Sequence, residues 1–359
     1  MLGLGSVLVI LIALSVVVFL HELGHMVAAK RSGIVVYEFA VGMGPRLLGF
    51  KKGDTLYTLR LLPIGGFVRL AGMDGDPNCR PEDNFYNKPL KSRALTIIAG
   101  PLMNLLLGFI IYTAIFMILG VPKVIPVIEE VSEQSPAIRA GLMAGDRVVS
   151  VQNVPLKEIM DQLIMKVKDS KEGDVFTLGI QRDGTRLIIP VPVEKLEESD
   201  PFPRLGVTFK SQRESLSLIK AVSYGGKQTI TIVGHIFEGL GTLVTGGASL
   251  DDLSGPVGLF QVASFELDRG FIFFLNIIAL ISINLGLINL FPFPVLDGGH
   301  LVLMLIEWIR GKALSKQLEL RVNQFGMILL LSLMIFLVFN DIVNWNDRVE
   351  FFDELNTTK

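Results

Sequence analysis

The chain has 359 residues, of which 50% are hydrophobic and 19% charged, and its formal net charge is -2. This balance is typical of a membrane protein and excludes the basic surface patch of a nucleic-acid-binding domain. The single cysteine, Cys79, excludes an internal disulfide and a cysteine metal cluster, and we interpret it as an ordinary reduced thiol rather than a catalytic one.

Four apolar stretches are long enough to cross a bilayer, which requires about 20 residues. They run from Leu4 to Met26, from Ala94 to Gly120, from Phe271 to about Phe291 and from Val322 to about Trp345. The first stretch lacks a basic n-region and a small-residue cleavage site, so we expect a retained helix rather than a signal peptide. The segments between the first two and the last two spans are rich in Lys and Arg. Because such loops stay cytoplasmic, both termini and residues 121–270 are predicted to be extracytoplasmic.

The first span contains the sequence FLHELGH, from Phe19 to His25. On a helix, His21 and His25 share one face about one turn apart and can both bind one Zn²⁺, and Glu22 can take a proton from a water molecule on the metal. Ionisable groups inside a membrane are costly and usually functional. We therefore favour a functional site over a hydrogen-bonded cluster of these three residues with only a structural role.

The third span supplies a candidate for the missing ligand in the sequence NLFPFPVLDGGHL, from Asn289 to Leu301. Its prolines and glycines break the helix, which a membrane protein tolerates only where the backbone is buried in protein or lines a cavity. We therefore expect Asp297 to lie on an unwound segment near the cytoplasmic side and to complete a His₂Asp zinc site. His300 is an alternative ligand but fits a supporting or packing role better, and His235 fits an ordinary interfacial position.

The first cytoplasmic loop contains an alternating segment, from Asp54 to Met73, with a Pro-Ile-Gly-Gly turn in its middle. This pattern predicts a β-hairpin or strand pair close to the membrane. Two interpretations fit the pattern equally: a structural sheet and a substrate-facing edge strand.

The sequence pattern changes in residues 121–212, which contain short predicted strands, turn residues and interspersed charges. The predicted elements are, in chain order, a short helix near Ser135, a turn at Gln152–Asn153, a longer helix near 157–168 and an Asp-Gly hairpin. With the Ala140–Val148 pattern, this order resembles a PDZ domain. Such domains bind extended peptides or chain ends at a sheet edge, here beside Val127 to Val131, although a structural spacer is the alternative. Residues 213–270 form an amphipathic juxtamembrane region.

Several motifs in order make the whole chain similar to the site-2 protease family of intramembrane zinc metalloproteases, bacterial regulator-of-sigma-E protease type, with room for a single PDZ domain. These motifs are HELGH in the first span, PIGGFVRL (Pro63–Leu70), GPLMN (Gly100–Asn104), SGPVG (Ser254–Gly258) and the NxxPxPxxDG segment that begins at Asn289. The Gly42–Gly44 loop carries Met43 where this family usually has Phe.

The resemblance implies a fold class and a division of the chain. We expect a polytopic α-helical membrane protein with about four transmembrane helices, a membrane-associated β-hairpin and an inserted extracytoplasmic α+β PDZ domain. The expected segments are a first helix (1–26), a cytoplasmic hairpin loop (27–93), a second helix (94–120), the PDZ domain (121–212), the juxtamembrane region (213–270), a broken third helix (271–310) and a fourth helix (322–345).

The resemblance also implies an activity: a zinc endopeptidase of a bacterial inner membrane. His21, His25 and Asp297 are the implied ligands of one Zn²⁺ per chain, and Glu22 is the implied general base. The implied substrate contacts come from the hairpin and from Gly65, Gly66, Asn104, Asn284 and Asn289.

The implied substrates are single-span membrane proteins, anti-sigma factors or signal-peptide remnants, usually cut first outside the membrane. A peptide or chain-end ligand of the PDZ domain and membrane lipid are the other implied partners. Two rivals from other classes are a non-catalytic scaffold that presents partners through its PDZ domain and a metal transporter that uses the same ligands.

Overall fold

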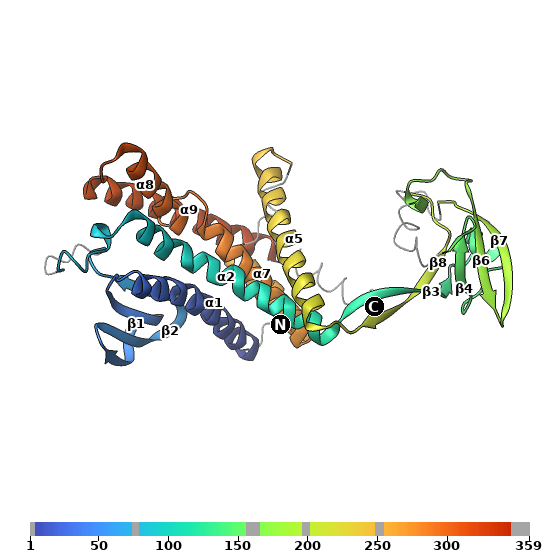
Figure 1. Ribbon diagram of the computed structural model, residues 1–359, viewed down its shortest axis with the longest axis horizontal. Coiled ribbons are helices and arrows are strands. Elements are labelled where there is room, and N and C mark those ends of the chain that lie inside the picture. Colours follow the sequence, from blue (N-terminus) through green and yellow to red (C-terminus); the bar gives the residue numbers. More distant parts are fainter. Residues whose placement is uncertain (1–3, 74–78, 156–165, 196–201, 248–254, 346–359) are drawn as a thin grey trace. The chain divides into compact units, whose positions relative to one another are not determined.

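The computed structural model describes residues 4–73, 79–155, 166–195, 202–247 and 255–345. The chain divides into two compact units. Met1–Ile118 and Ser217–Lys359 form the first unit, and Leu119–Leu216 form the second (Figure 1).

Four helices of the first unit are long and apolar enough to cross a membrane: α1 (Leu4–Arg31), α2 (Leu90–Leu119), α7 (Phe271–Asn289) and α9 (Lys316–Val343). They agree with the four expected spans. The described part of this unit also contains the helices α5 (Leu218–Val244), α6 (Pro256–Arg269) and α8 (Asp297–Arg310) and a 3₁₀ turn η1 (Phe85–Asn87) (Figure 1).

Glycines bring the spanning helices into close contact. A Cβ atom at Gly24 of α1 would lie 2.3 Å from the carbonyl oxygen of Ala99 in α2, and one at Gly108 of α2 would lie 2.4 Å from Ile283 of α7. Small residues at such points allow backbones to approach closely, as is common between membrane helices. Helix α1 therefore approaches α2 closely at Gly24, between the two histidines, and α2 approaches α7 closely at Gly108.

The α6 helix is anchored by a buried carboxylate. Asp341 of α9 is fully buried and accepts hydrogen bonds of 2.9 Å from the backbone N–H groups of Gly255 and Gly258. These N–H groups belong to the first turn of a helix, which has no internal acceptors for them and attracts negative charge. The described part of the SGPVG motif, Gly255–Gly258, thus forms a helix start whose free N–H groups are satisfied from another span.

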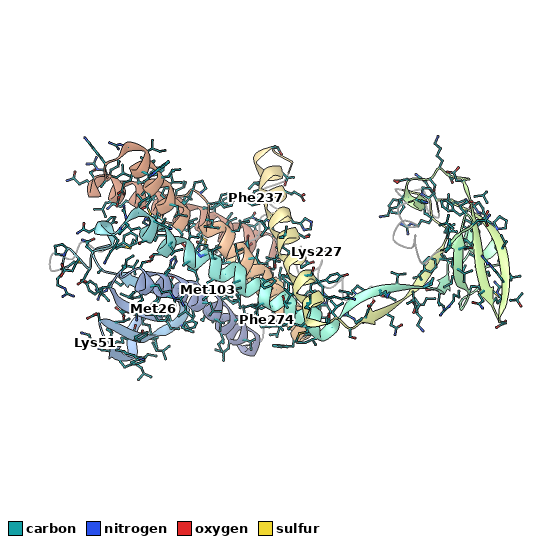
Figure 2. All side chains as sticks on the ribbon, viewed as in Figure 1. Met26, Lys51, Met103, Lys227, Phe237 and Phe274 are labelled. Atoms are coloured by element: carbon teal, nitrogen blue, oxygen red, sulfur yellow. The ribbon has the colours of Figure 1, made fainter. Side chains whose placement is uncertain are left out.

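Strands β1 (Val36–Lys52) and β2 (Thr55–Leu70) form a two-stranded sheet against α1. The prediction that Pro63–Gly66 forms the hairpin turn is wrong: Lys52 pairs with Thr55, so the tight turn lies at Gly53 and Asp54. Residues 38–41 pair both with 56–59 and with 66–69, because β2 bends between these two segments. Met26 of α1 packs in one buried cluster with residues of this sheet (Figure 2).

The second unit is a sheet in the order β7-β6-β4-β3-β8, with β5 paired to β4. The strands are β3 (Val121–Val131), β4 (Arg147–Val151), β5 (Val154–Pro155), β6 (Val175–Arg182), β7 (Thr185–Pro192) and β8 (Val207–Glu214). A short helix α3 (Pro136–Arg139) is capped by Ser135, and the expected Asp-Gly turn joins β6 to β7. Most of the helix expected at 157–168 lies outside the described residues.

The expected peptide edge beside Val127–Val131 is partly occupied. Val127 pairs with Arg147 of β4, and Ile128 forms backbone hydrogen bonds with Gly145 and Asp146, while β8 pairs with β3 on the other side. The edge strand on this side of the sheet is β8.

Candidate metal centre

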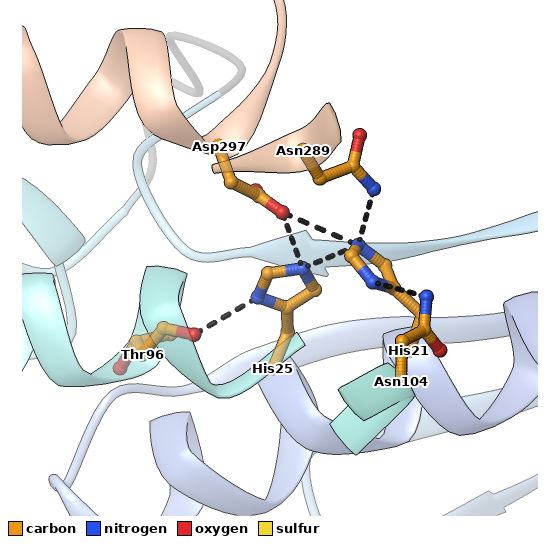
Figure 3. Close-up of polar contacts among 6 residues, drawn as sticks. All are labelled: His21, His25, Thr96, Asn104, Asn289 and Asp297. Carbon is orange, nitrogen blue, oxygen red and sulfur yellow. Dashed lines mark hydrogen bonds and ion pairs between the residues drawn. The ribbon is translucent and has the colours of Figure 1, made fainter. Parts of the chain in front are cut away.

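Helix α1 presents its two histidines on one face. The apolar sequence around them favours an unbroken helix, and residues four apart lie one above the other on such a helix. Both rings are buried, and their Nε2 atoms lie 3.1 Å apart (Figure 3). His21 and His25 therefore point to the same place.

Asp297 reaches these histidines from the start of α8. Its Oδ2 atom lies 3.2 Å from Nε2 of His21 and 3.4 Å from Nε2 of His25 (Figure 3). Contrary to the expectation of an unwound position, Asp297 is the first residue of a helix, and the unwound segment precedes it. A Cβ atom at Gly298 would lie 2.1 Å from the carbonyl oxygen of Phe291, so the tight turn that aims Asp297 requires glycine there.

The three donor atoms fit a zinc ion. Ligands at 2.0–2.1 Å from a tetrahedral zinc lie roughly 3.3 Å from one another. The observed separations of 3.1, 3.2 and 3.4 Å match this edge length. Among the described residues, these three side chains are the group that can place metal-binding atoms so close together.

Neighbouring groups orient both imidazoles. The Nδ1 atom of His25 lies 2.9 Å from the carbonyl oxygen of Thr96, which keeps the proton on Nδ1 and frees Nε2 for a metal. The amide of Asn104 lies 3.3 Å from Nδ1 of His21, and its Oδ1 atom is buried with no hydrogen-bond partner in the described part of the chain. Turning this amide by 180° presents the oxygen to Nδ1–H of His21, which frees Nε2 of that ring too.

A cavity of about 420 Å³ opens beside the three donor atoms. Glu22 lines it, and its carboxylate accepts a hydrogen bond from the backbone N–H of Val68 in β2. Phe67 and Leu285 contribute apolar walls. The three donor atoms thus lie beside a cavity with both polar and apolar walls, of a volume typical of ligand-binding sites.

The residues predicted to contact the substrate lie at different places relative to the cavity. Asn289 lines the cavity, with its Nδ2 atom 3.4 Å from Nε2 of His21, whereas Asn284 is exposed and Asn104 is fully buried behind His21. A Cβ atom at Gly66 would lie 3.6 Å from Cγ of Glu22, so this strand runs beside the centre. Gly65 faces Met43 within the hairpin.

The two other histidines lie apart from the ligand cluster. His300 lines the cavity, but the group of metal-binding atoms found among the described residues does not include it. His235 is exposed on α5.

Some residues that shape the metal centre could not be recognised from their side chains in the sequence. Thr96 and Val68 act through backbone atoms, which every residue type possesses. Gly100 is needed for space, because a Cβ atom there would lie 2.2 Å from Nε2 of His25. The GPLMN motif, which contains Gly100, was the available clue.

The chain is similar to known proteins over nearly its whole length. The model of peptidase family M50 matches residues 9–333. A putative zinc metalloprotease of Clostridium acetobutylicum is 35% identical, with 94% of this chain and 97% of the relative covered. The regulator of sigma-W protease RasP of Bacillus subtilis is 31% identical, with 94% and 98% covered. Among solved structures, the PDZ domain of an SdrC-like protein of Listeria monocytogenes matches at 18% identity and a TM-score of 0.21, over 23% of this chain and 84% of that chain.

Proposed function

The chain belongs to peptidase family M50, the site-2 proteases, and on that premise we propose that it cleaves single-span membrane proteins within the membrane. It is a zinc metalloprotease with several membrane-spanning helices. The observation that carries the proposal is the convergence of three metal-binding atoms on a cavity inside the helical unit (Figure 3). A site at that place reaches peptide bonds that soluble proteases do not reach.

Each polar residue of the centre has a proposed role. His21, His25 and Asp297 hold the zinc, and Thr96 and Asn104 fix the two imidazoles. When bound, zinc supplies a Lewis acid that polarises the scissile carbonyl and lowers the pKa of a water molecule. Glu22 would accept a proton from the attacking water at its carboxylate and pass it to the leaving amine, the role of a general base and then a general acid.

The edge of β2 is the proposed receptor for the substrate backbone. A helical substrate must unwind before a protease can reach its carbonyl groups, and its freed backbone groups then need new partners. The N–H of Val68 points at Glu22, so the edge of residues 66–70 faces the cavity. A substrate strand added at this edge lies across the metal centre, with Asn289 on its other side. Asn284, exposed on α7, is proposed to contact the substrate before it enters.

The second unit is proposed to be an extracytoplasmic PDZ domain that selects substrates trimmed by an earlier protease. Its open β8 edge lies beside a cavity of about 380 Å³, lined by Leu205, Gly206 and Val207, which suits a peptide chain end. Anti-sigma factors and signal-peptide remnants are the proposed substrates. If deletion of residues 122–210 leaves the cleavage of untrimmed substrates unchanged, this selection role is wrong.

The decisive experiment uses the purified full-length protein and labelled single-span peptides in detergent micelles. Wild-type protein should cut them, Glu22→Gln should lose about 100-fold or more in rate while it retains zinc, and a chelator should stop the wild type. Glu238→Gln, an exposed position on α5, is the matched control and should behave as wild type. No cleavage by the wild type, together with cellular function retained in Glu22→Gln, would favour the scaffold, and metal flux through liposomes without cleavage would favour the transporter.

A further inference from the structure

The β1–β2 sheet contains a partly buried ion pair, between Glu38 and Arg60, that lies outside the proposed metal centre. Glu38 of β1 is only 8% exposed, and its Oε1 accepts hydrogen bonds from Oγ1 of Thr58 at 2.8 Å and from Nη2 of Arg60 at 2.6 Å. Burial alone would raise the pKa of Glu38, but these hydrogen bonds and the Arg60 charge outweigh it and hold the pKa below its usual range. Glu38 is therefore a fixed anion that anchors the guanidinium.

The same guanidinium reaches two other parts of the hairpin. Its Nη1 donates to the carbonyl oxygen of Gly44 at 2.8 Å, and its Cζ lies 4.8 Å from the ring centroid of Phe67. Phe67 is a wall of the catalytic cavity. Arg60 thus connects the anchor in β1, the Gly42–Gly44 loop and the cavity wall.

The loop that Arg60 holds lies against the part of β2 that leads to the cavity. Gly42 and Gly44 both have a φ of +84°, and a Cβ atom at Gly42 would lie 2.5 Å from the carbonyl oxygen of Leu62. Met43 between them packs against Gly65, with its Cε 3.3 Å from the position of a Cβ atom there. The loop therefore covers the bend of β2 immediately before the edge strand of residues 66–70.

We propose that Arg60 is a positioning residue for substrate binding, which holds the Gly42–Gly44 loop and the Phe67 ring so that the adjoining edge of β2 can receive a substrate strand. This inference rests on the proposed function. The role needs arginine: its planar fork makes two hydrogen bonds in different directions and stacks on an aromatic ring. A lysine at this position would keep the charge beside Glu38 but could not make all three contacts at once.

The test compares Arg60→Met, Arg60→Lys and Arg46→Met in the full-length enzyme with the labelled single-span peptides. Arg46 is an exposed arginine of the same hairpin and serves as the matched control. For each variant, kcat, KM, the position of the cut by mass spectrometry, bound zinc and the thermal midpoint are measured. Arg60→Met should raise KM about tenfold and scatter the cut over neighbouring bonds, with kcat and bound zinc close to wild type. Arg60→Lys should raise KM about threefold, and Arg46→Met should match the wild type.

Three results would overturn the positioning role: an unchanged KM and cut position in Arg60→Met, a loss confined to kcat, or a loss accompanied by loss of zinc. If Arg60→Met does not fold, Arg60→Lys decides, because it keeps a cation beside Glu38; an unchanged KM there overturns the proposal. A wild-type enzyme that cuts none of the peptides refutes the proposed function instead, so the two failures are distinguishable.

Discussion

Replacement of Gly100 by alanine tests the close packing around His25. The added Cβ atom would lie 2.2 Å from Nε2 of His25, whereas ordinary contact begins at 3.4 Å, so ring and helix must separate by about 1.2 Å. Metal sites tolerate deviations of about 0.2 Å in ligand distance. The helix itself would gain, since alanine is about 1 kcal/mol more favourable than glycine inside a helix. A loss of zinc affinity therefore cannot come from weakened helix formation.

The assay is a zinc competition titration on purified Gly100→Ala, with peptide cleavage measured on the same sample. We expect zinc affinity to fall by at least about 100-fold, and cleavage to fall with it at limiting zinc. Gly234→Ala in α5 is the matched control, because a Cβ atom at that position meets no atom within 4 Å. Wild-type zinc affinity in Gly100→Ala would refute the inferred contact between α2 and the imidazole.

Two further predictions concern stability. Asp341→Ala leaves the N–H groups of Gly255 and Gly258 without their acceptor, so the unfolding free energy should fall by about 2–4 kcal/mol, seen as a lower thermal midpoint. The control is Ser332→Ala, because the Ser332 hydroxyl donates to a carbonyl group within α9, and its midpoint should stay close to that of the wild type. Equal midpoints in the two variants would contradict the anchoring role of Asp341. In the second unit, burial would raise the pKa of Asp146, but the two-pronged ion pair with Arg182 and the N–H of Met143 lower it below its usual value of about 3.9. Because the pKa of Asp146 is lower in the folded state, this stabilisation is complete above about pH 4 and disappears as the pH falls through the folded pKa. Hydrogen exchange of residues 119–216, measured in the full chain, should therefore accelerate in that pH range in the wild type. In Asp146→Asn the exchange rate should depend less on pH.

The sequence was sufficient to predict the four spans and the three side chains, His21, His25 and Asp297, that the structure brings together. Long apolar runs leave few structural alternatives, and ionisable residues within them need a partner or a function. Asp297 could be inferred as the third ligand because the prolines and glycines around it break a helix at membrane depth. Helix geometry then brought His21 and His25 to one point.

The features that sequence reasoning missed depend on contacts between distant segments. The sequence predicted a turn at Pro63–Gly66, whereas the tight turn lies at Gly53 and Asp54, because 66–69 pair with the distant residues 38–41. Asn284 and Asn289 both lie on the regular helix α7, where five residues correspond to about 140° of rotation, so the two side chains cannot share one cavity wall. Asn104 lies beside His21 because glycines let α1 and α2 approach closely.

The wide separation of the ligands along the chain has a consequence for biosynthesis. His21 and His25 enter the membrane early in translation, but Asp297 at the start of α8 follows only after the whole second unit has been made. A nascent chain without α8 therefore carries two of the three proposed metal ligands. On the proposed function, we expect zinc binding and proteolytic activity to arise only after α1 and α8 have packed together, late in maturation.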